Sequence, residues 1–446
     1  MNQKTILYIV HNHPSVRPGG AEGYALELYE GMRATNEFHP VLLAKTGPPV
    51  SNTSQIHGGV PFGHVNGDPN QYFLYTNNGF DWFYGVLKNK EIITFHFRQF
   101  LEAIRPDVVH FQHTLFFGYD MVREVRNVLP SCAIVYTLQE FLPICHRDGQ
   151  MLRNTDNTPC LDSSPLRCHE CFPQYSPQDF FMRRKFIQSQ LSLVDRFIAP
   201  SRFLLERYVD WGIPRDKILF EEYGRHPMVS AKPQQQERVH NRLAFFGQIS
   251  PYKGVDVLLE AMRLLDDSCE RAGDLEIAAE RNIPKESRPH LHLYGANLDV
   301  QEPAFQTRVR TLLEQTRRNV TFAGRYKLSQ QAALMSDADW VIVPSIWWEN
   351  SPLVIQEAFG HQRPVICSDI GGMAEKVTDG VNGLHFRAGD SRSLAQTIQR
   401  AVTTPGLWES LQKGIPQVHS MEQHLEIIKS IYNSILEPQK TTTLCY

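Results

Sequence analysis

The sequence predicts an α/β fold of two domains, each a parallel sheet doubly wound with helices on both faces. Short apolar runs rich in β-branched residues alternate with amphipathic stretches, as in strands buried on both faces of a parallel sheet. The alternation begins again halfway along the chain. The 446 residues also exceed the length at which one hydrophobic core stops growing.

Ten apolar runs are the expected strands. In the first half they are residues 6–10, 41–44, 108–111, 133–138 and 196–199, and in the second half 243–247, 290–294, 320–322, 340–343 and 365–367. The polar stretch 228–241 is typical of a linker. We therefore predict domains at 1–228 and 229–420.

The composition describes an ordinary globular chain. Hydrophobic residues make up 42%, charged residues 21%, and the formal net charge is -3. This charge gives no reason to expect nucleic acid as a partner. No apolar stretch approaches the ~18 residues of a membrane span, and the N-terminal apolar run is too short for a signal peptide. We expect a cytoplasmic protein whose eight cysteines are reduced.

A strong helix-start signal lies near residue 350. Ser351 is suited to cap a helix and Pro352 to occupy its first position, between two glutamates eight positions apart, Glu349 and Glu357. The free N–H groups of a helix start bind anions, so this segment is typical of a grip on a phosphorylated sugar. The alternative is that both acids only favour the helix through its dipole.

In each domain, a glycine-containing loop follows the first strand. The first, 19–22, reads Gly-Gly-Ala-Glu and departs from the dinucleotide fingerprint, which disfavours a nicotinamide cofactor. The second runs from Gly247 to Gly254, and its Lys253 would neutralise a diphosphate without a metal. Because ligands of open α/β sheets lie beyond the carboxyl ends of the strands, Lys253 and Glu349 are expected at one edge. An ordinary turn and a solvated lysine are the alternatives.

Two insertions interrupt the first domain. Residues 47–100 are rich in aromatic side chains, which form a small core or stack on a sugar or lipid. The stretch 178–194 predicts a packed helix whose basic residues 183–185 face solvent, with a peripheral membrane contact as the alternative.

Four cysteines fall within residues 145–171. Cys145, Cys160, Cys168 and Cys171 have the spacing C-x14-C-x7-C-x2-C. Four thiols ending in C-x2-C fit a closed structural zinc site in a reducing compartment. Free buried cysteines and a disulfide are the alternatives.

Together these segments resemble family 4 of the retaining glycosyltransferases. The resemblance rests on 19–22, Asp-Val-Val-His at 107–110, the Gly247 loop, 320–324, 344–357 and 364–372, in the family's order. It implies a GT-B architecture, in which two Rossmann-like domains face a cleft and the C-terminal one holds the nucleotide sugar. It also implies that a final helix, within 421–446, packs back onto the first domain.

The resemblance implies roles for individual residues. Glu349 would contact the donor sugar, Glu357 the ribose, and Lys253 the diphosphate, with Glu349 and Lys253 supporting catalysis. The remaining expected donor contacts are Gly20, Gly247, Arg325, Asn350, Ser351, Pro352 and Leu353. The family needs no catalytic cofactor, and its donors carry UDP or GDP.

The chain departs from the family pattern at two positions. Gln248 stands where an arginine is usual, and Arg225 is a candidate replacement. Gln139 stands where a histidine is usual, so His110 or His113 would take part instead. His110 is our catalytic candidate, against a structural role at the end of a strand.

The resulting hypothesis is a retaining transfer of a sugar from a nucleotide-diphosphate sugar to an acceptor hydroxyl. The acceptor would be a glycan or lipid-linked glycan in polysaccharide or glycoconjugate biosynthesis. A non-catalytic GT-B binding or scaffolding subunit and a GT-B nucleotide-sugar epimerase are the alternatives. The triplet 337–339 superficially resembles a D-x-D metal motif, but it directly precedes a buried strand, which favours a structural turn.

Overall fold

The computed structural model describes residues 3–17, 19–48, 50, 61–65, 67–76, 79–226, 239–266 and 287–437. The chain divides into two compact units. The first consists of Met1–Gly224 and His419–Tyr446, and the second of Arg225–Val418. Each unit contains one parallel α/β sheet and is described by itself. Most of the predicted linker, 228–241, lies outside the described residues.

The first sheet is wound outward from its first strand. β1 (Lys4–Val10) pairs in parallel with both β2 (Phe38–Thr46) and β7 (Val108–Phe111). The full order is β10-β9-β8-β7-β1-β2-β4-β3, and β3 is antiparallel to β4. The winding therefore changes direction next to β1, which is where folds of this kind bind ligands.

The other elements of the first unit follow in chain order. The strands are β3 (Phe62–Val65), β4 (Asp68–Tyr75), β5 (Phe80–Asp81), β6 (Val86–Leu87), β8 (Ala133–Thr137), β9 (Arg196–Ala199) and β10 (Ile218–Phe220). The helices are α1 (Gly20–Thr35), α2 (Glu91–Ile104), α3 (Met121–Val128), α4 (Pro165–Cys171), α5 (Pro177–Leu191), α6 (Arg202–Trp211), a 3-10 turn at Arg215–Lys217, and α14 (Met421–Leu436).

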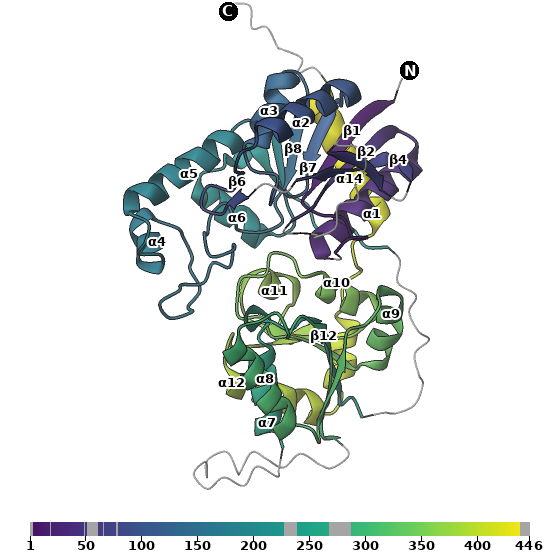
Figure 1. The fold of residues 1–446 in the computed structure, drawn as a ribbon. Coiled ribbons are helices and arrows are strands. Elements are labelled where there is room, and N and C mark those ends of the chain that lie inside the picture. Colours follow the sequence, from purple (N-terminus) through teal and green to yellow (C-terminus); the bar gives the residue numbers. More distant parts are fainter. Residues whose placement is uncertain are drawn as a thin grey trace, which may run out of the picture. The chain divides into compact units, whose positions relative to one another are not determined.

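The last helix, α14, belongs to the first unit. It lies beside α1 (Figure 1), and a Cβ added at Gly31 of α1 would come within 2.8 Å of the Leu425 side chain. The fully buried Tyr432 hydroxyl donates to Tyr8 at 3.2 Å. Ser420 begins the helix with a capping box. Of the expected segment 421–446, residues 438–446 lie outside the described part.

The second sheet is parallel throughout its described strands. Its order is β13-β12-β11-β14-β15-β16, and β11 pairs with both β12 and β14, so the winding reverses beside β11. Its strands are β11 (Arg242–Gln248), β12 (His290–Ala296), β13 (Val320–Gly324), β14 (Trp340–Val343), β15 (Val365–Ser368) and β16 (Gly383–Phe386).

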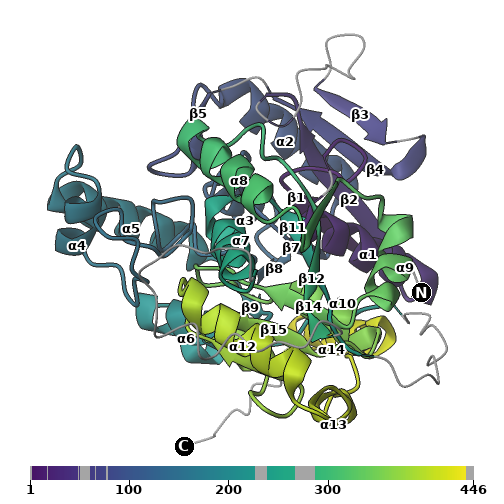
Figure 2. The ribbon, with the colours of Figure 1, turned by 90° about the horizontal axis from the view of Figure 1, so that it is seen from below.

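Helices cover both faces of the second sheet. They are a 3-10 turn at Pro251–Lys253, α7 (Val255–Leu264), α8 (Pro303–Gln315), α9 (Leu328–Asp337), α10 (Leu353–Gly360), α11 (Gly371–Lys376), α12 (Ser391–Thr403) and α13 (Leu407–Lys413). One core packs α7, α8, α12 and α13 on one face, and a second packs α9, α10 and α11 on the other. Figure 2 shows α7, α8 and α12 side by side. The doubly wound architecture predicted from the sequence is confirmed.

The aromatic insertion differs from its prediction. β4 pairs in parallel with β2 and extends the main sheet, so part of 47–100 is a regular element of the domain. The described aromatic side chains pack on one another, with Phe62 stacked on Phe100 at 5.0 Å. Residues 49, 51–60, 66 and 77–78 of this stretch lie outside the described part.

Candidate functional site

The carboxyl ends of β11 and β14 bring together the two segments singled out in the second unit. The turn that carries Lys253 follows β11, and Glu349 follows β14. Lys253 Nζ donates to Glu349 Oε1 at 2.6 Å. The reversal of the sheet thus places both predicted donor residues at one point.

Glu349 is buried and held by several donors. Its side chain is 6% exposed. Besides Lys253, Ser345 Oγ donates to Oε1 at 2.7 Å and Trp347 Nε1 at 3.1 Å. The side chain of Lys253 is 31% exposed, and its ammonium nitrogen lies 5.7 Å from the Trp347 ring centre. The carboxylate therefore fixes a partly exposed cation at the edge of the sheet.

Glycines let the two turns approach closely. Gly254 has φ +64°, and a Cβ there would lie 1.9 Å from the carbonyl oxygen of Pro344. Gly372 donates its N–H to the Glu349 carbonyl at 2.8 Å, and its own Cβ would lie 2.2 Å from the Asn350 carbonyl oxygen. Both positions require glycine for packing against the 344–350 turn.

The helix after Glu349 begins differently from the prediction. Pro352, with ψ 113°, is the N-cap of α10, and Leu353 is the first helical residue. Ser351 makes no capping bond. Instead its N–H donates to Asn350 Oδ1 at 2.6 Å. The buried Ser351 hydroxyl has no hydrogen-bond partner among the described residues, so the predicted cap is wrong and the hydroxyl is left next to free helix N–H groups.

Glu357 lies in the middle of α10 and is also ion-paired. Arg225 Nη2 donates to its Oε1 at 2.7 Å, and Gln331 Nε2 to its Oε2 at 2.6 Å. The pKa of Tyr326 is raised to about 12 by burial and then by the charge of Glu357. Arg225, the candidate replacement for the missing family arginine, thus forms an ion pair with Glu357, the predicted ribose-binding acid.

Three further predicted positions lie at strand ends of the second unit. Gly247 is the second-last residue of β11, and the last residue, Gln248, is exposed. Arg325, after β13, is exposed and makes no hydrogen bond or ion pair with the described residues. Among the described residues, the side chains of Gln248 and Arg325 have no hydrogen-bond or ion-pair partner.

In the first unit, Gly20 is the first residue of α1, after the extended Gly19. Close by, the sequence reasoning missed a buried polar cluster at the ends of β1 and β7. Glu22 of α1 lies 3.1 Å from His11 Nε2 and accepts from Asn12 Nδ2 at 3.4 Å. Burial raises the pKa of Glu22, but the hydrogen bond and charge of His11 outweigh it, and the pKa is lowered.

Three buried atoms of this cluster have no hydrogen-bond partner among the described residues. They are His11 Nδ1, Asn12 Oδ1 and Gln112 Nε2. An ionised Glu22 can only accept a hydrogen bond, so His11 Nε2 is the donor in this pair. Because buried polar atoms usually have a hydrogen-bond partner, these three atoms are candidates to contact a bound polar group. The polar triplet 11–13 at the end of an apolar run was the available sequence signal.

His113 and Glu140 complete the edge of the first sheet. The His113 ring lies 4.3 Å from the His11 ring, and its Nε2 lies 4.0 Å from Glu140 Oε1. Burial raises the pKa of Glu140 to about 8 and lowers that of His113 well below its ordinary value. Both groups are therefore predominantly neutral. Gln139, in the family's histidine position, donates to Gln112 Oε1 at 3.3 Å.

His110 does not face this cluster. It has no exposed surface, and its ring nitrogens bond Tyr432 Oη at 2.6 Å and Thr137 Oγ1 at 2.8 Å. Burial lowers its pKa to about 3. These contacts tie β7 to α14 and β8, so we assign His110 a structural role in place of the catalytic one expected.

The Asp337 and Asp339 pair lies at the opposite end of the second sheet. Asp339 is buried and accepts from the Arg242 N–H at 2.9 Å, where β11 begins. Asp337 pairs with the Arg242 side chain. The amino ends of the strands are remote from the Lys253 turn, in agreement with a structural turn.

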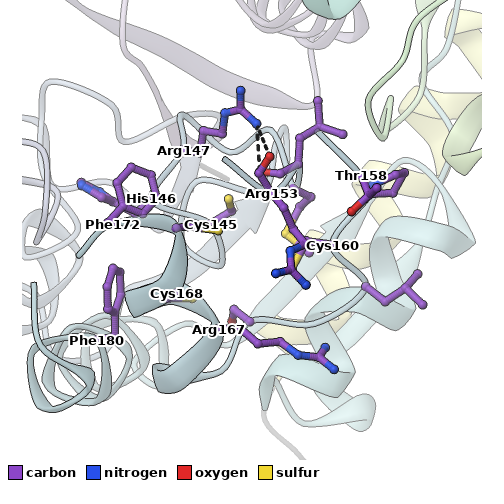
Figure 3. Close-up of a pocket in the computed structure, with 16 residues that line it drawn as sticks. Cys145, His146, Arg147, Arg153, Thr158, Cys160, Arg167, Cys168, Phe172 and Phe180 are labelled. Carbon is purple, nitrogen blue, oxygen red and sulfur yellow. Dashed lines mark hydrogen bonds between the residues drawn. The ribbon is translucent and has the colours of Figure 1, made fainter. Parts of the chain in front are cut away.

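The four predicted cysteines line one cavity of about 200 Å³ in the first unit (Figure 3). All four are free thiols. Burial raises the pKa of Cys145 to about 11 and of Cys168 to about 12, which argues against a reactive thiolate. Beside them, Arg183 is buried, contrary to the solvated basic face expected for 183–185.

A second group with metal-binding side chains was not noticed in the sequence. Glu221 Oε1 lies 2.8 Å from His419 Nε2 and 2.7 Å from His424 Nδ1. His424 Nε2 bonds the Tyr24 hydroxyl at 2.8 Å. Hydrogen bonds satisfy this group, and it joins the end of β10 to the start of α14. Glu221 lies about 200 residues before the two histidines, so no local spacing indicated the group.

Comparisons with known proteins agree with this geometry. Residues 18–219 match the profile of Glycosyltransferase Family 4, and residues 240–404 that of Glycosyl transferases group 1. The chain belongs to the group 1, family 4 glycosyltransferases. Among the described residues, no helix has the length and apolarity needed to cross a membrane.

Individual relatives are distant. A lipopolysaccharide 1,2-N-acetylglucosaminetransferase of Salmonella typhimurium is 26% identical over 215 residues, which cover 46% of this chain and 53% of the relative. An uncharacterized glycosyltransferase of Methanocaldococcus jannaschii is 24% identical over 43% of this chain and 47% of the relative. The chain thus spans about half the length of the curated relatives it matches.

Solved structures match over nearly the whole chain. Anabaena HepE in complex with UDP and glucose has a TM-score of 0.62 at 16% identity, covering 97% of this chain and 100% of that one. Sucrose-phosphate synthase from Thermosynechococcus elongatus has a TM-score of 0.67 at 16% identity, covering 97% and 99%. These likenesses establish the GT-B fold of this glycosyltransferase.

Proposed function

We propose that this chain transfers a sugar from a nucleotide-diphosphate sugar to an acceptor hydroxyl with retention of configuration. The observation that carries the proposal is the Lys253–Glu349 pair at the reversal of the second sheet, beside the unpartnered hydroxyl of Ser351. A fixed cation, a hydroxyl and free helix N–H groups together suit a diphosphate. Family membership and the UDP in HepE support such a donor.

The second unit would hold the donor. Lys253 and the start of α10 face the charge that develops on the departing diphosphate, the largest electrostatic change of the reaction. Glu349 positions Lys253 and contacts sugar hydroxyls, whereas Glu357 and Arg225 hold the ribose side. No metal is required for this charge balance.

The first unit would hold the acceptor hydroxyl. His11, whose Nε2 lies 3.1 Å from Glu22, has a buried Nδ1 without a partner among the described residues, and we assign this nitrogen to a neighbouring polar group of the acceptor. In the transfer step the acceptor oxygen bonds to the anomeric carbon and the bond from that carbon to the phosphate oxygen breaks. The acceptor proton passes to that leaving phosphate oxygen on the same face.

The acceptor class follows from the relatives only. Curated relatives act on lipopolysaccharide and on D-inositol 3-phosphate according to their names. A glycan or lipid-linked glycan in polysaccharide or glycoconjugate biosynthesis, used at the cytoplasmic side, is our proposal for this chain.

A panel of UDP-, GDP- and ADP-sugars tests the proposal. We expect one donor to release its nucleoside diphosphate and yield a glycoside whose anomeric configuration, read by NMR, equals that of the donor. Glu349→Gln and His11→Ala should lower turnover by about 10²-fold, whereas Glu409→Gln, an exposed-glutamate control in the second unit, should not.

The other outcomes are equally informative. Donor binding without turnover across the panel and across a set of glycan acceptors would identify a binding subunit. An epimerised nucleotide sugar would identify an epimerase. An inverted product would overturn the retaining mechanism.

A further inference from the structure

The segment 138–176 of the first unit is long and mostly irregular. Between β8 and α5 it contains one short helix, α4, and one isolated bridge, Leu152 with Pro159. Irregular segments of more than about 15 residues are uncommon in compact domains unless something holds them together. The side chains that converge inside this segment are its four cysteines.

The four thiols come from three separate turns and reach the same cavity. Cys145 precedes the bridge and Cys160 follows it, while Cys168 and Cys171 are three residues apart on α4 and thus share its face. Cys168 interacts electrostatically with each of the other three. Figure 3 shows Cys145, Cys160 and Cys168 arranged around the cavity. Four sulfur atoms therefore line one cavity.

Buried positive charge surrounds the thiols. The Arg183 guanidinium donates to three backbone carbonyls, those of Phe83 at 2.7 Å, Pro143 at 2.9 Å and Leu142 at 2.7 Å. The acidic groups that interact electrostatically with Arg183 are Tyr119, Cys145, Cys168 and Glu140. Two of these four groups are cysteine thiols of the cluster, and negative charge on them would offset the cost of burying the guanidinium.

Further arginines line the same cavity. Arg147 donates to the carbonyls of Leu152 at 3.2 Å and Arg153 at 2.9 Å, and Arg167 pairs with Asp162. A divalent metal on four thiolates carries a net charge of about −2, since each thiolate contributes one negative charge. The cavity thus supplies the positive surroundings that such a centre needs.

We propose that Cys145, Cys160, Cys168 and Cys171 bind one structural Zn²⁺ as a tetrahedral tetrathiolate, with Arg183 as its buried counter-charge. With Zn–S bonds of about 2.3 Å, the sulfurs of such a centre lie about 3.8 Å apart. Among the described residues, only Glu221, His419 and His424 have three ligand atoms all within 4.8 Å of one another, so no three of the cysteine sulfurs are that close. Zinc binding would therefore draw the cysteine-bearing turns closer together and fix segment 138–176 on α5.

The full-length chain, purified under reducing conditions without added metal, tests this. We expect about one zinc per chain by mass spectrometry of the metals. Cys168→Ser and Cys171→Ser should reduce zinc at least fivefold. Cys132→Ala, which removes a buried thiol outside the cluster, and His419→Ala should retain it.

If the cysteine variants fail to fold, replacing zinc by Co²⁺ in the wild-type chain tests the same ligands without a substitution. Tetrahedral Co²⁺ bound by four thiolates should give intense visible bands and a sulfur-to-metal charge-transfer band. Chain without stoichiometric zinc and without these bands would overturn the proposal. So would zinc that survives both cysteine changes but is lost in His419→Ala, or stoichiometric iron in place of zinc.

Discussion

The Lys253–Glu349 pair allows a quantitative test of the candidate donor site. Lys253→Met removes the ammonium group and keeps most of the aliphatic stem. Glu349 Oε1 then retains two neutral donors, Ser345 and Trp347, in a side chain that is only 6% exposed. Removing one partner of a fully buried pair costs about 3–5 kcal/mol. Because Lys253 is 31% exposed and solvent screens it, we expect about 2 kcal/mol.

Glu349→Gln should cost less stability. It leaves Lys253 without its carboxylate, but water reaches that ammonium group, so about 1 kcal/mol is expected. The double variant should lose less than the sum of the two single losses, with a coupling energy of about 1 kcal/mol. Turnover should fall in Lys253→Met by about 10²–10³-fold, the usual effect of removing one group that stabilises developing charge.

Urea unfolding followed by tryptophan fluorescence and nucleoside diphosphate release are the assays. Four of the six tryptophans lie in the second unit, so the fluorescence mainly reports that unit. Lys413→Ala, which removes an exposed lysine of the same unit, is the control. A coupling energy below about 0.3 kcal/mol would show that the pair is not formed in solution, and turnover within threefold of wild type would refute the role of Lys253.

Three other results are expected. Gly254→Ala should destabilise by about 3 kcal/mol or more, whereas Gly406→Ala, also at positive φ but in open space, should cost about 1 kcal/mol in the same urea experiment. Ser351→Ala should leave the unfolding free energy within about 0.5 kcal/mol of wild type, because no helix cap is lost. The same change should weaken donor binding measured by calorimetry. A loss of stability with unchanged donor binding would show that Ser351 caps the helix after all. Glu140, whose folded pKa is raised to about 8, binds its proton more tightly in the folded chain, so stability should fall as pH rises from about 4.5 to 8. Glu140→Gln should flatten that fall in urea titrations at several pH values, and an unchanged slope would contradict the assignment.

The strands were predictable because burial on both faces produces continuous apolar runs. Arg196–Ala199, Val108–Phe111 and Trp340–Val343 have the bounds expected. The short edge strands β10 and β16 were missed, since an edge strand has one neighbour and needs less apolar sequence. β4 was missed because the many aromatic residues of 47–100 suggested a separate insertion.

The donor side of the site was predictable for a topological reason. Lys253 and Glu349 follow two strands that the winding order makes neighbours, and the chain marks both turns with glycine or proline. The cap at Ser351 was wrong because local spacing does not fix the residue at which the helix begins: Pro352, with ψ 113°, is the N-cap. Arg183 was misplaced for a similar reason: its neighbours 184 and 185 suggested a solvated face, and only the fold reveals the three carbonyls around it.

The His11–Glu22 cluster was not found in the sequence because it depends on a contact between a residue that follows β1 and a residue of α1. His11 and Glu22 lie on different elements, and neither is unusual alone. Together they form a buried imidazole–carboxylate pair in the first unit, whereas Lys253 supplies a cation in the second. Under the proposed function, the cation suits a charged diphosphate, and the imidazole–carboxylate pair suits the polar groups of an acceptor. Although Gln139 replaces the family histidine, the first unit still has a histidine at its strand ends. This is His11, whose Nδ1 has no partner among the described residues, whereas both ring nitrogens of His110 are hydrogen-bonded.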